Sequence, residues 1–376
     1  MSFDQILKTS KVVVCAGSGG VGKTTLSAAL AVRAAQLGLR TLVLTVDPAK
    51  RLATALGLDL TEHEVKKVEG LKSGGQLEAG VIDSKKTFDA FVVRHSSNQD
   101  LAQRLLKNRL YQQLSTTLSG SQEFTSLERL YEAYESKKYD VIILDTPPTK
   151  HAIDFLKAPE RLSNLFQDSV TKWFMFAGGE KGGILSGLVN RGTRTVLKSL
   201  ELLTGSQFID ELVDFFASIR NLQKVLRDRS KGAQELLLSE QTAFVVVTSF
   251  DAAKLTEAHY LQSVLKNMGY RLSGVIINRA FPLWLSNGSA ETDTSTSGSA
   301  SSELAEFYQT FRRYHSQRYE LYEKFEKTVG ESVRIVRIPE YNQDVHGLEG
   351  LERLAERLAE QADEKINSNP SNSNGM

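Results

Sequence analysis

The chain has 376 residues, a hydrophobic content of 41% and a formal net charge of +1 at pH 7. This length fits two average domains or one large α/β domain, and the apolar content suffices for a sizeable core. A charge balance this close to zero gives no general attraction to nucleic acid or to an anionic membrane.

The single cysteine, Cys15, excludes an internal disulfide and any single-chain site that needs two or more thiolates. This favours a reducing compartment. The opening residues MSFDQILKTSK hold no apolar run of signal-peptide length. No uncharged apolar stretch approaches the roughly 20 residues that a membrane span needs. We therefore expect a cytoplasmic protein without an integral membrane segment.

Short runs rich in β-branched residues recur between stretches of helical spacing. Continuous apolar strands separated by helices are expected where helices cover both faces of a mostly parallel sheet. The pattern therefore predicts an α/β fold with a doubly wound, mostly parallel sheet. The runs are KVVVCA (11–16), TLVLTV (41–46), YDVIILD (139–145), TAFVVVTS (242–249), LSGVIIN (272–278) and VRIVRI (333–338).

The segment GSGGVGKT at residues 17–24 matches the phosphate-binding pattern G-x-x-x-x-G-K-[ST] in full. A β-branched run precedes it and a helical stretch follows, which is the context that this motif requires. We expect Lys23 to reach the β- and γ-phosphates of ATP and the Thr24 hydroxyl to bind Mg²⁺ directly. Backbone N–H groups and the helix N-terminus add further donors. The predicted nucleotide-binding residues of the loop are Gly19, Gly20, Val21, Gly22, Lys23, Thr24 and Thr25.

Two aspartates follow later strands of the predicted sheet. Asp47, in TVDPAKRLA, is expected to orient and deprotonate the attacking water. Asp145, at the end of VIILD, is placed to hold Mg²⁺ through water. An aspartate at the end of a strand is often only a helix cap. Together with the loop, however, the pattern predicts Asp47, Asp145 and Lys23 as the catalytic residues.

Two helical blocks, at about 86–138 and 152–236, interrupt the alternation of strands and helices. They either just cover the sheet or form an inserted α-helical subdomain within a single ATPase domain that spans 1–376. Large apolar side chains alternate with glycine pairs in KWFMFAGGEKGGILSG (172–187), which argues against a regular helix. An exposed segment of this kind would form a mobile lip over a hydrophobic groove.

Two segments have the composition of disordered chain. Residues 286–303 are almost free of apolar side chains and predict a surface loop. The tail at 366–376 is rich in Asn, Ser and Pro and is expected to be disordered as well.

Three motifs, SGGVGKTT (18–25), DPAKRLATALG (47–57) and DTPPTKHAIDFLKAPERL (145–162), together resemble one family. It is the deviant-Walker ATPases of arsenite pumps and tail-anchored-protein targeting, and the resemblance covers roughly residues 10–360. The third motif, switch II in that family, is the most specific. The resemblance implies Mg²⁺-dependent ATP hydrolysis, with ATP and ADP states that close and open a homodimer.

The resemblance also implies roles for individual residues. Asp47 would be the catalytic acid or base and Asp145 the switch II carboxylate of the magnesium shell. Asn278, in VIINRA, matches the asparagine that reads adenine. The segment IPEYNQDVHGLEGL (338–351) resembles the loop that closes over the base, which places Pro339 near adenine.

Ser18 departs from the family pattern, because the family loop carries a lysine there that crosses the dimer interface to the partner's phosphates. A cation delivered in this way can be worth about 10³ to 10⁵ in rate, judging from arginine fingers. The serine cannot replace it. Lys50 and Arg51 are candidates for the missing charge, unless they only form a solvated helix start.

Two ligand sets of the family are missing from the sequence. Zinc-clamped targeting dimers use C-x-x-C pairs, and this chain has none, so we expect no zinc. Arsenite sites use several cysteines, and Cys15 alone cannot supply one. His151 belongs to the switch II motif and is better interpreted as a switch residue than as a metal ligand.

The leading interpretation is an ATP-driven dimeric switch that handles a protein client, such as a hydrophobic segment, with a possible membrane-protein partner. One alternative is a spatial-organising ATPase of cell division or plasmid partition. The acidic polar face of the last helix would be repelled by anionic lipid, and the near-neutral charge opposes nucleic-acid binding. A second alternative is an ATP-gated scaffold with little turnover. An iron–sulfur electron-transfer protein lacks its cysteines.

Overall fold

Two compact units make up the fold. The computed structural model describes residues 2–46, 51–58, 65–72, 74–117, 121–148, 152–158, 205–280, 300–330, 333–341, 345 and 347–364. Unit 1 comprises Met1–Val81, Lys137–Ile153 and Leu237–Met376, and unit 2 comprises Ile82–Ser136 and Asp154–Leu236. Unit 2 is therefore built from two insertions into the chain of unit 1, and the predicted helical blocks cover most of it.

Unit 1 is built around an eight-stranded sheet with the order β3-β4-β2-β5-β1-β6-β7-β8. Neighbouring strands are parallel except for the antiparallel pair β3–β4 at one edge. The strands are β1 (Val12–Gly17), β2 (Arg40–Thr45), β3 (Val65–Lys67), β4 (Gln76–Val81), β5 (Val141–Pro148), β6 (Thr242–Ser249), β7 (Leu272–Ala280) and β8 (Arg334–Pro339).

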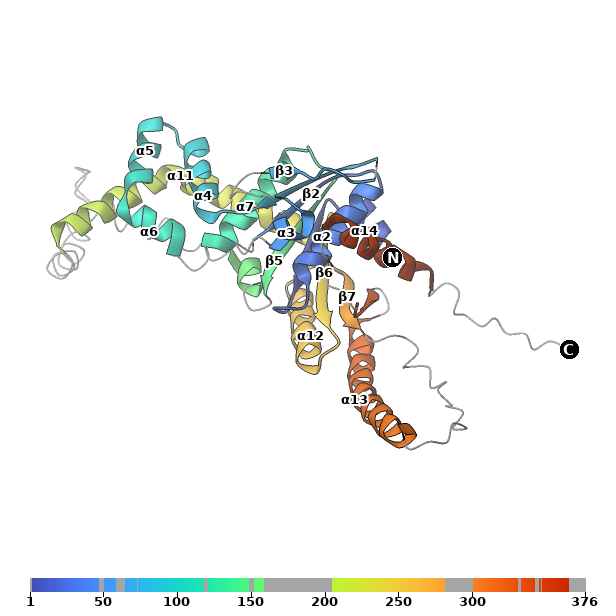
Figure 1. Cartoon of the computed structure of the whole chain (residues 1–376). Helices are drawn as coiled ribbons and strands as arrows, with labels where there is room; N and C mark the ends of the chain where they lie inside the picture. Colours follow the sequence, from blue (N-terminus) through green and yellow to red (C-terminus); the bar gives the residue numbers. More distant parts are fainter. Residues whose placement is uncertain are drawn as a thin grey trace. The chain divides into compact units, whose positions relative to one another are not determined.

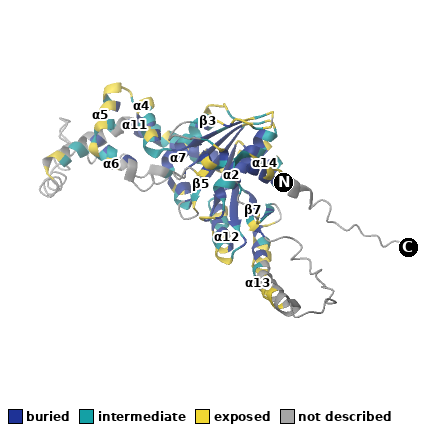
Figure 2. Cartoon of the chain, viewed as in Figure 1, coloured by how far each residue is buried: buried dark blue, intermediate teal, exposed yellow. Residues whose placement is uncertain are grey.

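Helices of unit 1 pack against this sheet, and α13 extends away from it (Figure 1). The alanine-rich α2 packs against β2, β5 and α14, and its small side chains allow this close approach. Helix α12 packs on β6, and α13 packs on α12. Buried residues are concentrated in the strands and α2 (Figure 2). The helices are α1 (Phe3–Thr9), α2 (Lys23–Gln36), α3 (Arg51–Leu56), α12 (Ala252–Asn267), α13 (Ala300–Val329) and α14 (Gly347–Glu364).

The predicted fold class is confirmed, because every β-branched run in the sequence forms a strand of the mostly parallel sheet. Strands β3 and β4 were not predicted. In β4 the buried Leu77 and Ala79 alternate with Gln76 and Glu78, so that no continuous apolar run marks the strand. In β3, which has three residues, two are lysines. Strand β3 forms the edge of the sheet, where polar side chains are tolerated, and β4 is the next strand inward, between β3 and β2.

The predicted loop at 286–303 ends earlier than expected, because α13 begins at Ala300. Serines are common at helix starts, and Glu303 is favoured near the positive end of the helix dipole. The rest of this segment lies outside the described residues, as do the tail at 366–376 and the segment 172–187.

Unit 2 is helical throughout its described residues. Aromatic side chains form its core, in which the rings of Phe88, Phe91, Tyr111 and Phe124 contact one another. Such ring pairs stabilise a small core beyond their buried area. The helices are α4 (Ser84–His95), α5 (Gln99–Lys107), α6 (Arg109–Thr117), α7 (Ser121–Glu135) and α11 (Ser206–Leu238).

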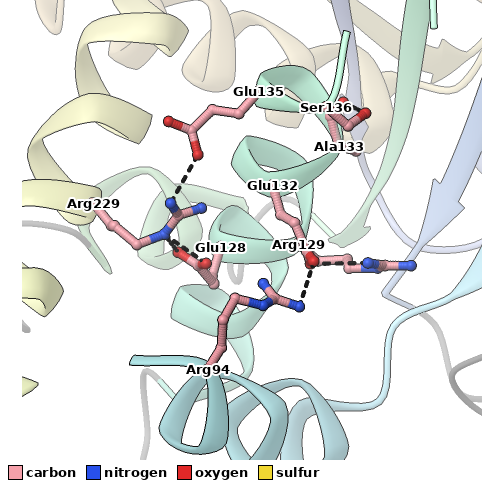
Figure 3. Close-up of polar contacts among 8 residues, drawn as sticks. All are labelled: Arg94, Glu128, Arg129, Glu132, Ala133, Glu135, Ser136 and Arg229. Carbon is pink, nitrogen blue, oxygen red and sulfur yellow. Dashed lines mark hydrogen bonds and ion pairs between the residues drawn. The ribbon is translucent and has the colours of Figure 1, made fainter. Parts of the chain in front are cut away.

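An ion-pair network joins three helices of unit 2 (Figure 3). Arg229 of α11 donates from Nε to both carboxylate oxygens of Glu128 at 2.7 Å and from a terminal nitrogen to Glu135 at 2.8 Å. Arg94 of α4 contacts Glu132 of α7 at 2.6 Å. The side chain of Glu128 is only 3% exposed, and burial raises its pKa while Arg229 opposes that rise. Losing Arg229 would therefore leave a buried acid without its cation.

We predict that Arg229→Met lowers the free energy of unfolding by about 3 kcal/mol, because it removes one partner of a buried ion pair. Urea titration followed by circular dichroism measures the change. Lys231→Met on the same helix is the matched control, since the Lys231 side chain is 76% exposed and its pair with Glu235 lies in solvent. Equal effects of the two substitutions would show that the buried ion pair contributes no more to the free energy of unfolding than the exposed pair does.

Candidate active site

The loop between β1 and α2 turns through glycines in the left-handed conformation. Gly20 has φ +76° and Gly22 has φ +89°, and Gly22 is the residue that caps α2. Side chains with a Cβ rarely adopt these angles. An added Cβ at Gly22 would also lie 2.5 Å from Nδ2 of Asn278. The sequence therefore folds here into a tight backbone loop whose N–H groups precede a helix, as phosphate binding requires.

Lys23, the first residue of α2, folds back across this loop. Its ammonium nitrogen donates a hydrogen bond of 2.8 Å to the backbone carbonyl of Ser18, and the residue is 8% exposed. A buried ammonium is costly unless oxygen atoms surround it. Lys23 is therefore held within the loop, where phosphate oxygens of a nucleotide would be bound.

Asp145 joins the loop to the neighbouring strands. One of its carboxylate oxygens, Oδ2, accepts hydrogen bonds from the hydroxyls of Thr24 at 2.7 Å and Thr45 at 2.9 Å. The parallel register pairs Asp145 with Cys15 on β1 and with Thr45 on β2, which brings residues from distant parts of the chain together. Asp145 is 2% exposed.

The oxygens of Thr24 and Asp145 fit the chemistry of Mg²⁺. This ion prefers hard oxygen ligands and usually binds one or two protein groups together with nucleotide phosphates and water. A hydroxyl and a carboxylate that already lie within 2.7 Å of each other provide such a pair beside the loop. Thr45 was not predicted from the sequence. Its only signal is a polar residue near the end of an otherwise apolar strand.

Asn278 contacts the loop from the far side of β6. Its Nδ2 donates a hydrogen bond of 2.8 Å to the backbone carbonyl of Val21. The register of β6 and β7 places Asn278 beside Ser249, at the end of β6. The next residue, Arg279, has φ +52° and lies where the register between β7 and β8 shifts. Pro339 is the last residue of β8 and pairs with Ala280, the last residue of β7, so it lies at the same carboxyl-terminal end of the strands. Whether these residues contact adenine stays a prediction.

A family model described as "Anion-transporting ATPase" matches residues 10–360 of the chain. The chain belongs to this family. It is an ATP-hydrolysing enzyme, as the family and its relatives are. The loop and Asp145 lie within the matched residues.

Several curated relatives are similar to the chain. The arsenical pump-driving ATPase 1 of Aquifex aeolicus is 25% identical over 362 residues, which cover 93% of this chain and 78% of the relative. ATPase get3 of Aspergillus terreus is 26% identical over 352 residues, which cover 93% of this chain and 91% of the relative. The ATPase ASNA1 homolog of Babesia bovis is 28% identical over 244 residues, which cover 60% of this chain and 64% of the relative.

Some predicted residues of this ATPase cannot be placed. Asp47, Lys50 and His151 lie outside the described residues. Arg51, the other candidate for the charge missing at Ser18, is exposed at the start of α3. Of the third motif, residues 145–148 and 152–158 are described, and residues 152–158 form a helix.

Cys15 is completely buried among the apolar residues of β1. Burial raises the pKa of its thiol to about 12, so the thiolate is disfavoured at neutral pH. Among the described residues of the ATPase, no group of three or more His, Cys, Asp and Glu side chains is arranged to hold a metal ion. The helices described in this structure include none that is both long and apolar enough to cross a membrane.

We predict that Gly22→Ala destabilises the protein by about 1–3 kcal/mol more than Gly20→Ala, because its methyl group overpacks against Asn278. Both substitutions place an alanine at a positive φ, but a Cβ at Gly20 meets nothing within 4 Å. Urea unfolding of the two variants isolates the contact. Equal stabilities would mean that Asn278 does not hold the loop.

Proposed function

We propose that this ATPase is a Mg²⁺-dependent, homodimeric switch whose ATP and ADP states handle a protein client. The observation that carries the proposal is the hydrogen bond between Thr24 and Asp145. It connects the residue expected to bind Mg²⁺ to the first residue of the switch II motif.

The proposed chemistry assigns one task to each side chain. Lys23 binds phosphate oxygens and offsets their charge, and Thr24 and Asp145 bind Mg²⁺ directly and through water. The ion neutralises charge on the phosphates when it is bound. Asp47 orients the attacking water and accepts its proton.

The path of the chain supports a coupling between nucleotide hydrolysis in unit 1 and the state of unit 2. After Asp145, the hydroxyl of Thr146 donates to the backbone carbonyl of Cys15 at 2.9 Å, which fixes this end of β5 beside β1. The chain then leaves unit 1 at Ile153, within the switch II motif, and enters unit 2 at Asp154. A movement of Asp145 on hydrolysis would therefore be transmitted along a short covalent path into unit 2.

The class of client rests on the resemblance to ATPases that target tail-anchored proteins. The Aquifex relative is named for an arsenical pump, but one buried cysteine does not provide an arsenite site, so we do not propose metalloid transport here. Dye binding to hydrophobic surface that differs between ADP and an ATP analogue would support a client groove. Flotation with liposomes or salt-sensitive retention on DNA would favour the spatial-organising class instead.

We predict that ATP turnover per mole of protein rises with protein concentration, because a dimer completes the site. The measurement is a steady-state phosphate-release assay over a wide concentration range. Lys23→Ala, which removes the phosphate-binding cation, provides the blank. A specific rate that stays constant, and only just above that blank, would contradict the dimeric switch and favour an ATP-gated scaffold.

A further inference from the structure

Position 18, where the resemblance to the family implies a lysine, is occupied by a buried serine. Ser18 is 1% exposed, and within the described part of the chain its Oγ makes no hydrogen bond of full geometry. A buried hydroxyl loses its hydration, so a polar group is expected close to it. Such an atom indicates that something beyond the loop itself belongs at this place.

The N-terminal turn of α12 lies next to Ser18. Strands β1 and β6 run parallel, and Gly17, the residue before Ser18, lies opposite Val247, the residue before Thr248. The hydroxyl of Thr248 donates a hydrogen bond of 2.9 Å to the backbone carbonyl of Lys254. Helix α12 packs against both β1 and β6. Lys254 is therefore attached to the end of the strand that borders the loop.

Two side chains of α12, Lys254 and Glu257, form an ion pair close to Ser18. The ammonium of Lys254 lies 3.3 Å from the carboxylate of Glu257. The Ser18 hydroxyl approaches that carboxylate as well, and Ser18 and Lys254 both lower the pKa of Glu257. The side chain of Lys254 keeps 31% of its surface exposed, so it can still reach a ligand.

Ser18 and the first turn of α12 follow the carboxyl-terminal ends of β1 and β6. Ligands of parallel α/β folds bind outside the carboxyl ends of the strands, and both β1 and β6 end here. Asp251 caps α12 by accepting from the backbone N–H groups of Ala253 and Lys254 at 3.0 Å and 3.3 Å. The cap fixes the first turn of α12, and with it the direction from which Lys254 leaves the helix.

We propose that Lys254, held beside Ser18 by Glu257, supplies to bound ATP the positive charge that position 18 lacks. This inference rests on the proposed function, since it concerns the same phosphates. Lys254 contacts the terminal phosphate, and Glu257 is a positioning residue. The geometry favours Lys254, because α12 packs against β1 and Lys254 pairs with the carboxylate that Ser18 approaches.

Substitution of Lys254 tests the proposal directly. We expect Lys254→Ala to lower kcat at least about tenfold, since a cation on the transferred phosphate stabilises the transition state. The same variant should lose affinity for a non-hydrolysable ATP analogue but not for ADP. Lys266→Ala, an exposed lysine in the last turn of the same helix, is the matched control and should match the wild type in both assays.

Two further variants separate charge from position. Adding Ser18→Lys to Lys254→Ala should restore kcat, because it returns a cation to the loop, and failure to do so in a folded protein overturns the replacement. Glu257→Gln keeps Lys254 but removes its anchor, and should lower kcat while the KM for ATP stays unchanged. Unchanged kcat in that variant would remove Glu257 from the positioning role.

The readouts distinguish this inference from the proposed function. If Lys254→Ala matches Lys266→Ala in kcat and in the ATP-analogue-to-ADP affinity ratio, only the inference fails. If the wild type turns over no faster than Lys23→Ala, the proposed ATPase switch fails, while the affinity ratio still decides whether Lys254 contacts the terminal phosphate.

Discussion

The carboxylate of Asp145 is the point on which the nucleotide site depends. A single oxygen, Oδ2, accepts from Thr24 at the start of α2 and from Thr45 at the end of β2. These contacts require the parallel register of β1, β5 and β2, because a slip of one residue would turn Asp145 to the other face of the sheet. The buried apolar strands therefore do more than stabilise the fold. They fix the position of one carboxylate relative to the loop.

Local patterns were enough to predict the loop, the fold class and Asp145. The glycines and Lys23 follow one another in the sequence, and the apolar strands are continuous runs. Contacts between distant segments could not be predicted in this way. Thr45 gains its role only from its neighbour on β5, and Lys254 gains its position from Thr248 and from the packing of α12. Strands β3 and β4 were not predicted because polar residues interrupt their apolar pattern, β3 at the edge of the sheet and β4 next to it.

The two units of the chain divide structural tasks between them. Unit 1 holds the loop, Asp145 and Asn278 on one sheet. Unit 2 is held together by a hydrophobic core with several aromatic rings and by the buried pair of Glu128 and Arg229. The chain enters unit 2 at Asp154, within the switch II motif. This arrangement suits an enzyme in which hydrolysis in one unit changes the state of the other.

The central claim is that Thr24, with Asp145, forms the protein's share of a magnesium site. The most direct test measures the affinity for a fluorescent ATP analogue with and without Mg²⁺ in the wild type, Thr24→Val and Thr45→Val. The account predicts that Mg²⁺ increases affinity in the wild type and in Thr45→Val but not in Thr24→Val, because only Thr24 is a direct ligand. An equal increase in all three proteins would contradict it.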